Sequence, residues 1–300
     1  MKELRRLTSI TEFHRIRGLQ PSAHPLISVV NYADLVLTSA NNHINWVLDY
    51  YSISLKRDVV IKFRYGQQKY DFDEGIMYFI APGQVFNIEV PEGDHSKRSG
   101  WMLLIHPDFF WNTALSKTIK QYEFFGYATN EALFLSEKEE TTIVNIIQNI
   151  RQEYNSNIDK FTQQIIISHI ETLLNYADRF YHRQFITRKI ANHQVLEKLE
   201  MLLSNEELFA KGIPSVQLIS ERLNISPNYL SSLLKNLTGQ STQQHIQNKL
   251  IEIAKQKLST TSLSVNEVAY ELGFEHPQSF RKFFKSKTNM SPLEFRASFN

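Results

Sequence analysis

The sequence predicts an α+β chain of two domains, in which a β-rich region and a pair of helices precede an all-α C-terminal domain. Three observations support this. Short runs of β-branched and aromatic residues alternate with turn-forming residues over about residues 30–110. Apolar residues recur at helical spacing from residue 136 onward. A pattern of two short helices joined by a tight turn occurs twice after residue 215.

The first third of the chain changes character near residue 30. Residues 1 to about 30 contain Pro21 and Pro25 and little periodic signal, so we expect an irregular arm. Turn-forming residues then separate a series of short predicted strands. The strands are predicted over residues 35–37, 44–51, 59–65, 76–80, 85–90 and 101–105, with turns at 73–75, 82–83 and 91–94. Regularly spaced short strands favour an antiparallel sandwich or barrel.

Helical periodicity begins at Ser136. Ser136 and Glu139 have the spacing of a capping box, in which each side chain hydrogen-bonds a backbone N–H at the helix start. A second helix is predicted over about residues 160–182, and its apolar stripe is wider than packing against one neighbour requires. Such a helix either lies between the β-rich region and a partner helix or forms the seam between two copies of the chain. Residues 183–194 are polar and basic and are interpreted as a linker.

The C-terminal domain, residues 195–300, has its clearest pattern at residues 264–285. Ser264 and Glu267 form a second capping box, and Gly273 supplies the left-handed backbone conformation that ends a helix in a sharp turn. In the next helix three phenylalanines fall on one face, which leaves polar and basic residues on the other. The phenylalanines are Phe280, Phe283 and Phe284, and the opposite face carries Gln278, Arg281, Lys282 and Lys285.

The same pattern occurs upstream. Residues 227–235 align with residues 277–285, with the proline, three large apolar positions and the final lysine, Lys235, in register. Asn224 stands where the second copy has its turn glycine, and asparagine is the non-glycine residue that best tolerates that conformation. Between the copies, residues 241–258 carry apolar residues at helical spacing. We therefore expect one helix that joins both copies into a single body.

Basic residues concentrate in the part of the chain that holds the repeat. The net charge of the whole chain is only +2, but residues 222–300 hold ten lysines and arginines against five glutamates, a net charge of +5. From Arg281 to Lys287 there are four cations and no acid. Such a face suits the major groove of double-stranded DNA, where Arg, Lys and Gln read base edges or contact phosphates. A basic helix that only faces solvent would have the same sequence pattern. The occurrence of the pattern twice is what favours DNA binding.

This sequence lacks the residues that several kinds of chemistry require. No cysteine is present, which excludes disulfides, thiol nucleophiles and cysteine-based zinc sites. No His-x-His pair, glycine-rich phosphate loop or nucleophile motif occurs, and His43, His95 and His106 are isolated. We therefore expect no metal, no cofactor and no enzymatic activity. No run approaches the roughly 20 apolar residues of a membrane span, so a cytoplasmic protein without a membrane partner is expected.

Three short motifs follow one another in the C-terminal domain. They are Gly273-Phe274, then Phe280-x-x-x-Phe284-Lys285, then Ser291-Pro292-x-x-Phe295-Arg296. With these motifs, about residues 195–300 resemble the AraC/XylS family of transcription regulators, whose DNA-binding domain holds two helix-turn-helix units joined by a long helix. The resemblance implies DNA contacts on the outer faces of both second helices. By position these are Asn228, Ser231, Ser232 and Lys235 in the first copy and Gln278, Arg281, Lys282 and Lys285 in the second.

Two residues depart from the family pattern. Asn289 stands where the family usually has glycine, and Lys282 stands where arginine is common. Asparagine accepts the left-handed turn, so the fold is not threatened. Lysine lacks the bidentate fork of arginine, so Lys282 is expected to favour phosphate over guanine.

The resemblance also implies a function for the whole chain. It implies a sequence-specific transcription regulator, more often an activator than a repressor, with DNA and RNA polymerase as partners. The N-terminal domain, residues 1–182, would be a cupin-like barrel that binds a small-molecule effector, and helices within residues 136–182 would form a homodimer. Two alternatives stay open: a cupin-type enzyme with an accessory DNA-binding tail, and a nonspecific architectural DNA-binding protein. Metal bound to the purified protein would support the enzyme. Equal affinity for DNA of every sequence would support the architectural protein.

Overall fold

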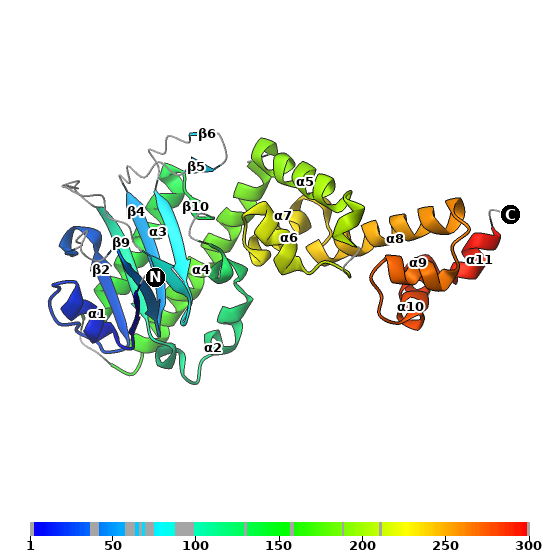
Figure 1. Ribbon diagram of the computed structural model, residues 1–300. Helices are drawn as coiled ribbons and strands as arrows, with labels where there is room; N and C mark the ends of the chain where they lie inside the picture. Colours follow the sequence, from blue (N-terminus) through cyan, green and yellow to red (C-terminus); the bar gives the residue numbers. More distant parts are fainter. Residues whose placement is uncertain are drawn as a thin grey trace. The chain divides into compact units, whose positions relative to one another are not determined.

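The structure, a computed structural model, describes residues 3–36, 42–57, 64–65, 68–69, 75–87, 99–128, 131–156, 159–187, 189–209 and 212–298. The chain divides into an N-terminal unit, Met1–Gln184, and a C-terminal unit, Phe185–Asn300, which are described in turn (Figure 1). Some predicted features lie outside the described residues. These are residue 37, strand residues 59–63 and 88–90, most of the turn at 73–75, the turn at 91–94, and His95.

The N-terminal unit contains two main β-sheets. The larger sheet is antiparallel, with the strand order β10-β7-β4-β9-β2. Its strands are β2 (Ile27–Asn31), β4 (Tyr51–Arg57), β7 (Ile76–Ile80), β9 (Ser99–Ile105) and β10 (Leu133–Phe134). The smaller sheet has the order β1-β3-β8, with β1 parallel to β3. Its strands are β1 (Glu3–Leu7), β3 (Ile44–Leu48) and β8 (Val85–Asn87), and β5 (Arg64–Tyr65) pairs separately with β6 (Gln68–Lys69).

One buried apolar cluster joins the two main sheets. Helix α1 (Ile10–Ile16) adds Ile10 and Phe13 to it. The sheet residues of the cluster are Val30, Met102 and Leu104 from the larger sheet and Leu7, Ile44, Trp46 and Leu48 from the smaller one. Side chains from both sheets therefore share one core, which stabilises the unit by removing apolar surface from water. The prediction of a β-sheet region followed by helices is confirmed.

The first 31 residues are more regular than predicted. The expected irregular arm contains β1, α1 and β2. Ser9 begins α1, because its Oγ accepts a hydrogen bond from the backbone N–H of Glu12 at 3.2 Å. In β1 only Leu7 is buried, so this strand has no alternating pattern to reveal it. The strand predicted at residues 35–37 is not found at its two described residues, since Leu35 instead follows the 3₁₀ turn η1 (Tyr32–Asp34).

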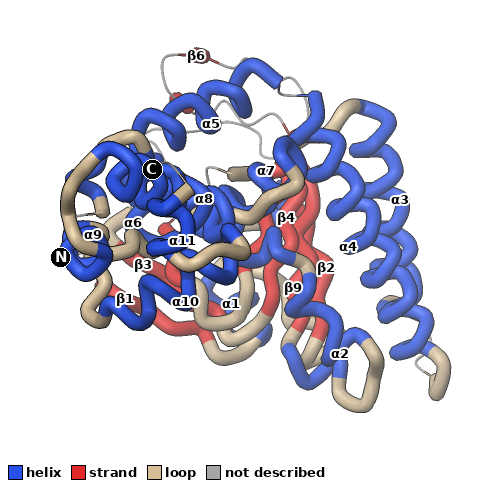
Figure 2. The backbone as a smooth tube through the Cα atoms, turned by 90° about the vertical axis from the view of Figure 1, so that its right-hand side faces the viewer, coloured by secondary structure: helices blue, strands red, loops and turns tan. Residues whose placement is uncertain are grey.

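Helices α3 (Glu137–Tyr154) and α4 (Thr162–Thr187) lie side by side against the larger sheet (Figures 1 and 2). The backbone N–H of Ser136 donates to Oε2 of Glu139 at 2.9 Å, which confirms the predicted capping box. The apolar stripe of α4 is buried within the unit. Its buried members are Ile166, Ile167, Ile170, Leu173, Leu174 and Ala177. Most of the residues that predicted a seam between two copies are therefore covered inside one copy, while Ile165 of the same stripe is 40% exposed.

Short helical turns between β9 and β10 add an aromatic layer to the same unit. Phe124 lies 4.4 Å from the ring of Phe79 on β7, and Phe125 lies 5.0 Å from the ring of Tyr51 on β4, both measured between ring centroids. The turns are η3 (Pro107–Phe110), α2 (Leu115–Thr118), η4 (Ile119–Gln121) and η5 (Glu123–Gly126). Tilted and edge-on rings of this kind pack favourably.

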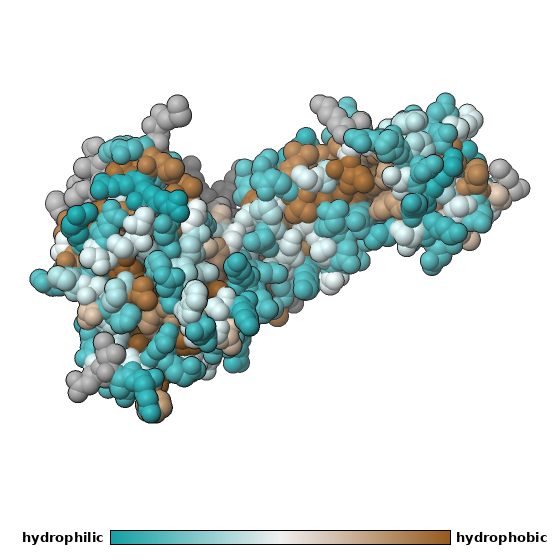
Figure 3. Space-filling model, turned by 90° about the horizontal axis from the view of Figure 1, so that it is seen from below, coloured by the Kyte–Doolittle hydropathy of each residue, from teal (hydrophilic) through white to brown (hydrophobic). Residues whose placement is uncertain are grey.

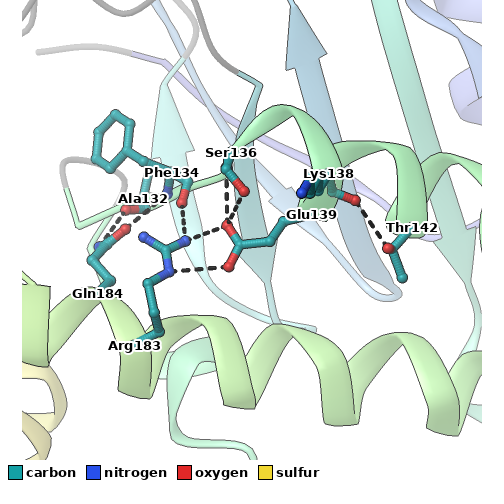
Figure 4. A network of polar contacts seen from close by, with 8 residues as sticks. All are labelled: Ala132, Phe134, Ser136, Lys138, Glu139, Thr142, Arg183 and Gln184. Atoms are coloured by element: carbon teal, nitrogen blue, oxygen red, sulfur yellow. Dashed lines mark hydrogen bonds and ion pairs between the residues drawn. The ribbon is translucent and has the colours of Figure 1, made fainter.

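Arg183 on α4 joins helix α3 to the edge strand β10 (Figure 4). Its Nη2 donates to Oε2 of Glu139 at 2.5 Å and to the carbonyl oxygen of Phe134 at 2.8 Å. The buried amide of Gln184 accepts from the N–H of Phe134 at 2.8 Å and donates to the carbonyl of Ala132 at 3.1 Å. The last turns of α4 thus satisfy the backbone groups that an additional strand would otherwise pair with.

The C-terminal unit is helical. Its elements are α5 (Lys189–Leu203), η6 (Glu206–Leu208), α6 (Val216–Leu223), α7 (Pro227–Thr238), α8 (Thr242–Thr260), α9 (Val265–Glu271), α10 (Pro277–Thr288) and α11 (Pro292–Ala297). Residues 183–194, interpreted as a linker, are helical wherever they are described, because α4 continues to Thr187 and α5 starts at Lys189. Across the described part of the chain, no helix combines the length and apolarity needed to cross a bilayer.

Candidate nucleic-acid interface

The second repeat, α9 and α10, begins with the predicted capping box. The N–H of Ser264 donates to Oε2 of Glu267 at 2.7 Å, and the N–H of Glu267 donates to Oγ of Ser264 at 3.2 Å. Hydrogen bonds from the Ser264 side chain and then from its backbone N–H lower the pKa of the Glu267 carboxyl group. The charged carboxylate is therefore the form that starts the helix.

The turn between α9 and α10 needs a glycine for two reasons. Gly273 has φ = 74°, and the N–H of Phe274 reaches back to the carbonyl of Ala269 at 3.0 Å. These are features of a helix that ends in a left-handed residue. A Cβ atom at position 273 would also lie 2.2 Å from Cα of Gly212, just upstream of the first repeat. The two backbones therefore touch where neither residue has a side chain.

Helix α10 is held in place by phenylalanines. Phe280 and Phe284 are completely buried, and Phe283 is half-buried. The ring of Phe280 lies 5.4 Å from that of Phe274, and the ring of Phe284 lies 5.5 Å from that of Phe295 on α11. The predicted inward face is confirmed. Its burial fixes which residues of α10 point outward.

The outer face of α10 carries the four residues predicted for it. Gln278, Arg281, Lys282 and Lys285 are all exposed. Arg281 donates from Nη2 to Oδ1 of Asn266 on α9 at 2.9 Å. Within the described residues, no carboxylate is at ion-pair distance from Lys282 or Lys285. Their positive charge is thus available to an anionic partner such as phosphate.

The first repeat, α6 and α7, has the same turn built with asparagine. Asn224 has φ = 56°, and the N–H of Ile225 donates to the carbonyl of Ser220 at 3.1 Å, which matches the bond across the second turn. Asn224 is exposed, so its side chain has room that position 273 lacks. Asn289, after α10, also adopts the left-handed conformation, with φ = 59°. Both asparagine substitutions of the turn glycine are therefore accommodated as predicted.

The outer face of α7 is less polar than predicted. Asn228 and Lys235 are exposed, while Ser231 is half-buried and its Oγ lies 3.1 Å from Oγ1 of Thr242. Ser232 is buried, with 6% of its surface exposed, so its side chain does not join them. The position aligned with Lys282 thus differs in the two repeats. A serine is short enough for neighbouring atoms to close over it, whereas a lysine extends beyond them.

Helix α8 connects the repeats as the sequence predicted (Figure 1). It starts with a capping box between Ser241 and Gln244. Its apolar stripe is buried: Ile246, Leu250, Ile253, Ala254 and Leu258. Nε of Arg296 donates to the carbonyl of Leu258 at 3.0 Å, near the end of α8. The arginine of the third motif therefore serves the fold by satisfying a helix C-terminal carbonyl.

Two polar residues of the interface were not anticipated from the sequence. Asn266 orients Arg281, and Thr242 contacts Ser231. Each is the first or second residue of a helix, with no periodic or motif signal, and its contact comes from another helix. Only the packing of helices around the repeat reveals such partners.

The surface of the C-terminal unit is uneven in polarity. Figure 3 shows hydrophilic residues over most of the visible part formed by α9–α11, while apolar residues gather where the first helices of this unit lie. Exposed apolar side chains in the first repeat region include Ile213, with 39% of its surface exposed, and Leu218, with 37% exposed. The polar, basic character that DNA requires therefore belongs chiefly to the second repeat.

The isolated histidines have ordinary partners. Nδ1 of His106 accepts a hydrogen bond from the N–H of Asp108 at 3.3 Å and begins η3. His43 is exposed, with Nε2 3.8 Å from Oε2 of Glu3. Over the residues that the structure describes, no three His, Asp or Glu side chains gather at metal-binding spacing.

The C-terminal unit is similar to known proteins. Residues 219–298 match a family model described as a helix-turn-helix domain. The Bacillus subtilis (strain 168) transcriptional regulatory protein YesN, described as uncharacterized, is 34% identical over 107 residues, or 34% of this chain and 28% of that protein. YfiF of the same strain, described as an uncharacterized HTH-type transcriptional regulator, is 31% identical over 144 residues, or 47% of this chain and 42% of that protein.

Solved structures also align with the same region. One of them is the C-terminal domain of the two-component response regulator yesN from Fusobacterium nucleatum, with 30% identity and a TM-score of 0.32. The alignment covers 34% of this chain and 98% of that chain. The matches span less than half the length of these two curated relatives.

Proposed function

We propose that this chain, whose residues 219–298 form an AraC-type helix-turn-helix DNA-binding domain, is a sequence-specific transcription regulator. The observation that carries the proposal is the repeat itself. The helix-turn-helix unit occurs twice, and its second helix is α7 in the first copy and α10 in the second. Helix α8 joins both copies in one compact body. Two equivalent recognition helices in one domain suit a double-stranded DNA site with two adjacent major-groove segments.

The second repeat would supply most of the sequence readout. Arg281 is exposed and held by Asn266, so it suits the bidentate contact to a guanine edge. Gln278 would read a base beside it, and Lys282 and Lys285 would hold phosphates. In the first repeat, Asn228 would contact a base and Lys235 a phosphate, while Ser231 can add only a short-range contact. Ser232 is not included, because it is buried.

The length of the connecting helix α8 favours binding to a deformed DNA. Helix α8 has 19 residues and is therefore about 28 Å long at 1.5 Å per residue. Neighbouring major-groove segments on one face of straight B-DNA are about 34 Å apart. Simultaneous binding of α7 and α10 would bend the duplex toward the protein, and the sequence dependence of that bending would add to specificity.

The N-terminal domain would control the DNA-binding domain. We assign it, with boundaries at residues 1–182, as a cupin-like barrel that binds a small-molecule effector, with residues 183–194 leading into the DNA-binding domain, 195–300. The shared core of its two sheets supports a binding fold of this type. Dimerisation would use the helices within residues 136–182, where Ile165 on α4 is 40% exposed, and the DNA-bound dimer would contact RNA polymerase, chiefly as an activator.

The proposal is tested by selecting bound duplexes from a random DNA pool with the full-length protein near physiological salt. The expected result is a motif with two parts about one helical turn apart. An Arg222→Ala variant, which removes an exposed cation outside α7 and α10, should recover the same motif. Equal affinity for all sequences, with a salt dependence set only by phosphate contacts, would support the architectural alternative instead.

A further inference from the structure

A phenylalanine upstream of the helix-turn-helix repeat is buried against the first recognition helix. Phe185 belongs to the C-terminal unit, has 1% of its surface exposed and precedes residues 219–298, which match the family model. Its ring centroid lies 5.2 Å from that of Tyr229 on α7, and the two rings meet edge to face at 64°. Pairs of this geometry are stabilising beyond the apolar area that they bury. Helix α7 is therefore held by a residue that the motif itself does not include.

The backbone of Phe185 is also held in place. Nδ2 of Asn192 on α5 donates a hydrogen bond to the carbonyl oxygen of Phe185 at 2.5 Å. The Asn192 side chain is buried, so loss of this bond would leave a polar group unsatisfied inside the protein. The bond ties the end of α4 to α5. The Phe185 ring is thus presented to α7 from a fixed backbone.

The contact with Phe185 falls on the first turn of α7. The N–H of Tyr229 donates to Oγ of Ser226, the residue that caps this helix, at 3.2 Å. Tyr229 directly follows Asn228, which is exposed and is proposed above to contact a base. The N-terminal residues of a recognition helix are the ones that reach base edges. The aromatic contact therefore acts on the turn of α7 that carries the proposed base contact.

The second recognition helix is supported differently. Ser279 on α10 aligns with Tyr229 on α7, and Ser279 is exposed. Helix α10 is instead held by the phenylalanines of its own repeat and of α11 described above. The two recognition helices thus depend on different parts of the chain. A change at Phe185 should act on the first helix and not on the second.

We propose that Phe185 is a positioning residue for the first recognition helix, and that the base preference of the half-site read by α7 depends on it. The inference rests on the proposed function, because it names a residue that controls how one half of the DNA site is read. Phe185 acts through Tyr229 and does not contact DNA. Its ring limits the tilt of the first turn of α7, and a side chain displaced by about 1 Å loses much of the contact that it was placed to make.

The test measures discrimination by the full-length protein, which is the ratio of its affinities for the selected duplex and for duplexes with one base pair changed. A smaller folded fraction lowers both affinities alike, so this ratio responds to positioning and not to stability alone. Phe185→Leu should lower discrimination at the half-site of α7 by about threefold to tenfold and leave the half-site of α10 unchanged. Because the chain has no cysteine, the exposed position Lys287→Cys on α10 gives a single attachment point for an iron chelate. Cleavage of bound DNA by that chelate marks the half-site of α10.

Three further variants make the result specific. Phe180→Leu is the matched control, since Phe180 is buried on α4 in the N-terminal unit, and it should leave discrimination at both half-sites unchanged. Tyr229→Leu should lower the same discrimination as Phe185→Leu, and the double variant should lose little more, because each change removes the same contact. Asn192→Ala keeps both rings and removes the hydrogen bond to Phe185, so it tests the inference if Phe185→Leu does not fold. It should give a smaller loss at the same half-site.

Several outcomes would overturn the inference. These are equal losses at both half-sites, the same loss in Phe180→Leu, or unchanged discrimination in Phe185→Leu and Asn192→Ala. The failure of the proposed function looks different. A natural protein without any preference among duplexes refutes that function and this inference with it, whereas a natural preference that both variants retain refutes only the role of Phe185.

Discussion

Arg281 on the outer face of α10 donates a hydrogen bond from Nη2 to Oδ1 of Asn266 on α9, at 2.9 Å. The bond joins the first helix of the second repeat to one of the exposed cations of the second helix. It holds a long side chain that would otherwise sample many rotamers, so less conformational entropy is lost when the guanidinium binds DNA. The amide carries no charge, so it orients the arginine without competing strongly with phosphate or a guanine edge.

Replacement of Arg281 by alanine should cost about 1–3 kcal/mol of binding free energy on the selected site. If Arg281 reads a base, the loss will be accompanied by relaxed preference at one base position. The measurement is the affinity for the selected duplex and for its single-base variants at fixed salt. A uniform loss on all duplexes would instead assign Arg281 to phosphate. Lys282→Ala is the matched control, and for it the uniform loss is expected.

Asn266→Ala should weaken binding less than Arg281→Ala does, by about 0.5–1.5 kcal/mol, the net value of one hydrogen bond. The effect should vanish when Arg281 is already alanine, because Asn266 acts through that side chain. A double-mutant cycle on DNA affinity measures this coupling. Additive losses would show that Asn266 contacts DNA by itself.

In the first repeat, burial separates two residues that the sequence places on one face. Asn228→Ala should reduce affinity or preference at one base pair, whereas Ser232→Ala should leave DNA binding nearly unchanged. Both variants are measured on the same selected duplex. A larger loss for Ser232→Ala, with unchanged melting temperature, would mean that α7 exposes this side chain when DNA is bound.

Phe284→Ala should destabilise the C-terminal unit by about 3–5 kcal/mol, because it empties a completely buried aromatic site. Phe283→Ala is the control, since that side chain is half-buried and should cost about half as much. Denaturant unfolding followed by circular dichroism gives both values. Similar losses for the two variants would show that α10 is rotated relative to the arrangement described above.

The capping carboxylates should make stability depend on acid pH. Hydrogen bonds to Ser264 and to Ser291 lower the pKa values of Glu267 and Glu294 below their ordinary value of 4.5. A lowered folded-state pKa means that the stabilisation is fully present above about 4.5 and is lost as the pH falls through the folded-state pKa. Glu267→Gln keeps the capping hydrogen bond without a titrating group, so its unfolding free energy should fall less steeply with acid. An unchanged pH slope would exclude a contribution from Glu267.

The C-terminal unit was predictable because its signals are local. Capping boxes, the left-handed residues Asn224 and Asn289 and the phenylalanine face of α10 are each specified within a few residues. These signals decide where helices start, end and face, and the structure follows them. The burial of Ser232 was not predictable, because it depends on how α7 packs against other helices.

The N-terminal unit depends on contacts between residues that are distant in sequence. Strand β1 pairs with β3 about forty residues later, and four of its five residues are exposed, so neither periodicity nor composition marks it. Arg17 stands in a charged segment that reads as surface, yet it is buried against Trp46. Both features follow from tertiary packing, which overrides local preference.

The contact between Gly212 and Gly273 has a consequence for the DNA sites this protein can use. Because the backbones meet without side chains and α8 bridges the same two repeats, we expect α7 and α10 to move as one body. Each base pair inserted between two half-sites rotates the second by about 34° around the duplex axis and moves it away by about 3.4 Å. Two helices that move as one body would not follow such a change in helical phase, so a single inserted base pair should abolish simultaneous binding even when both half-sites keep their sequences.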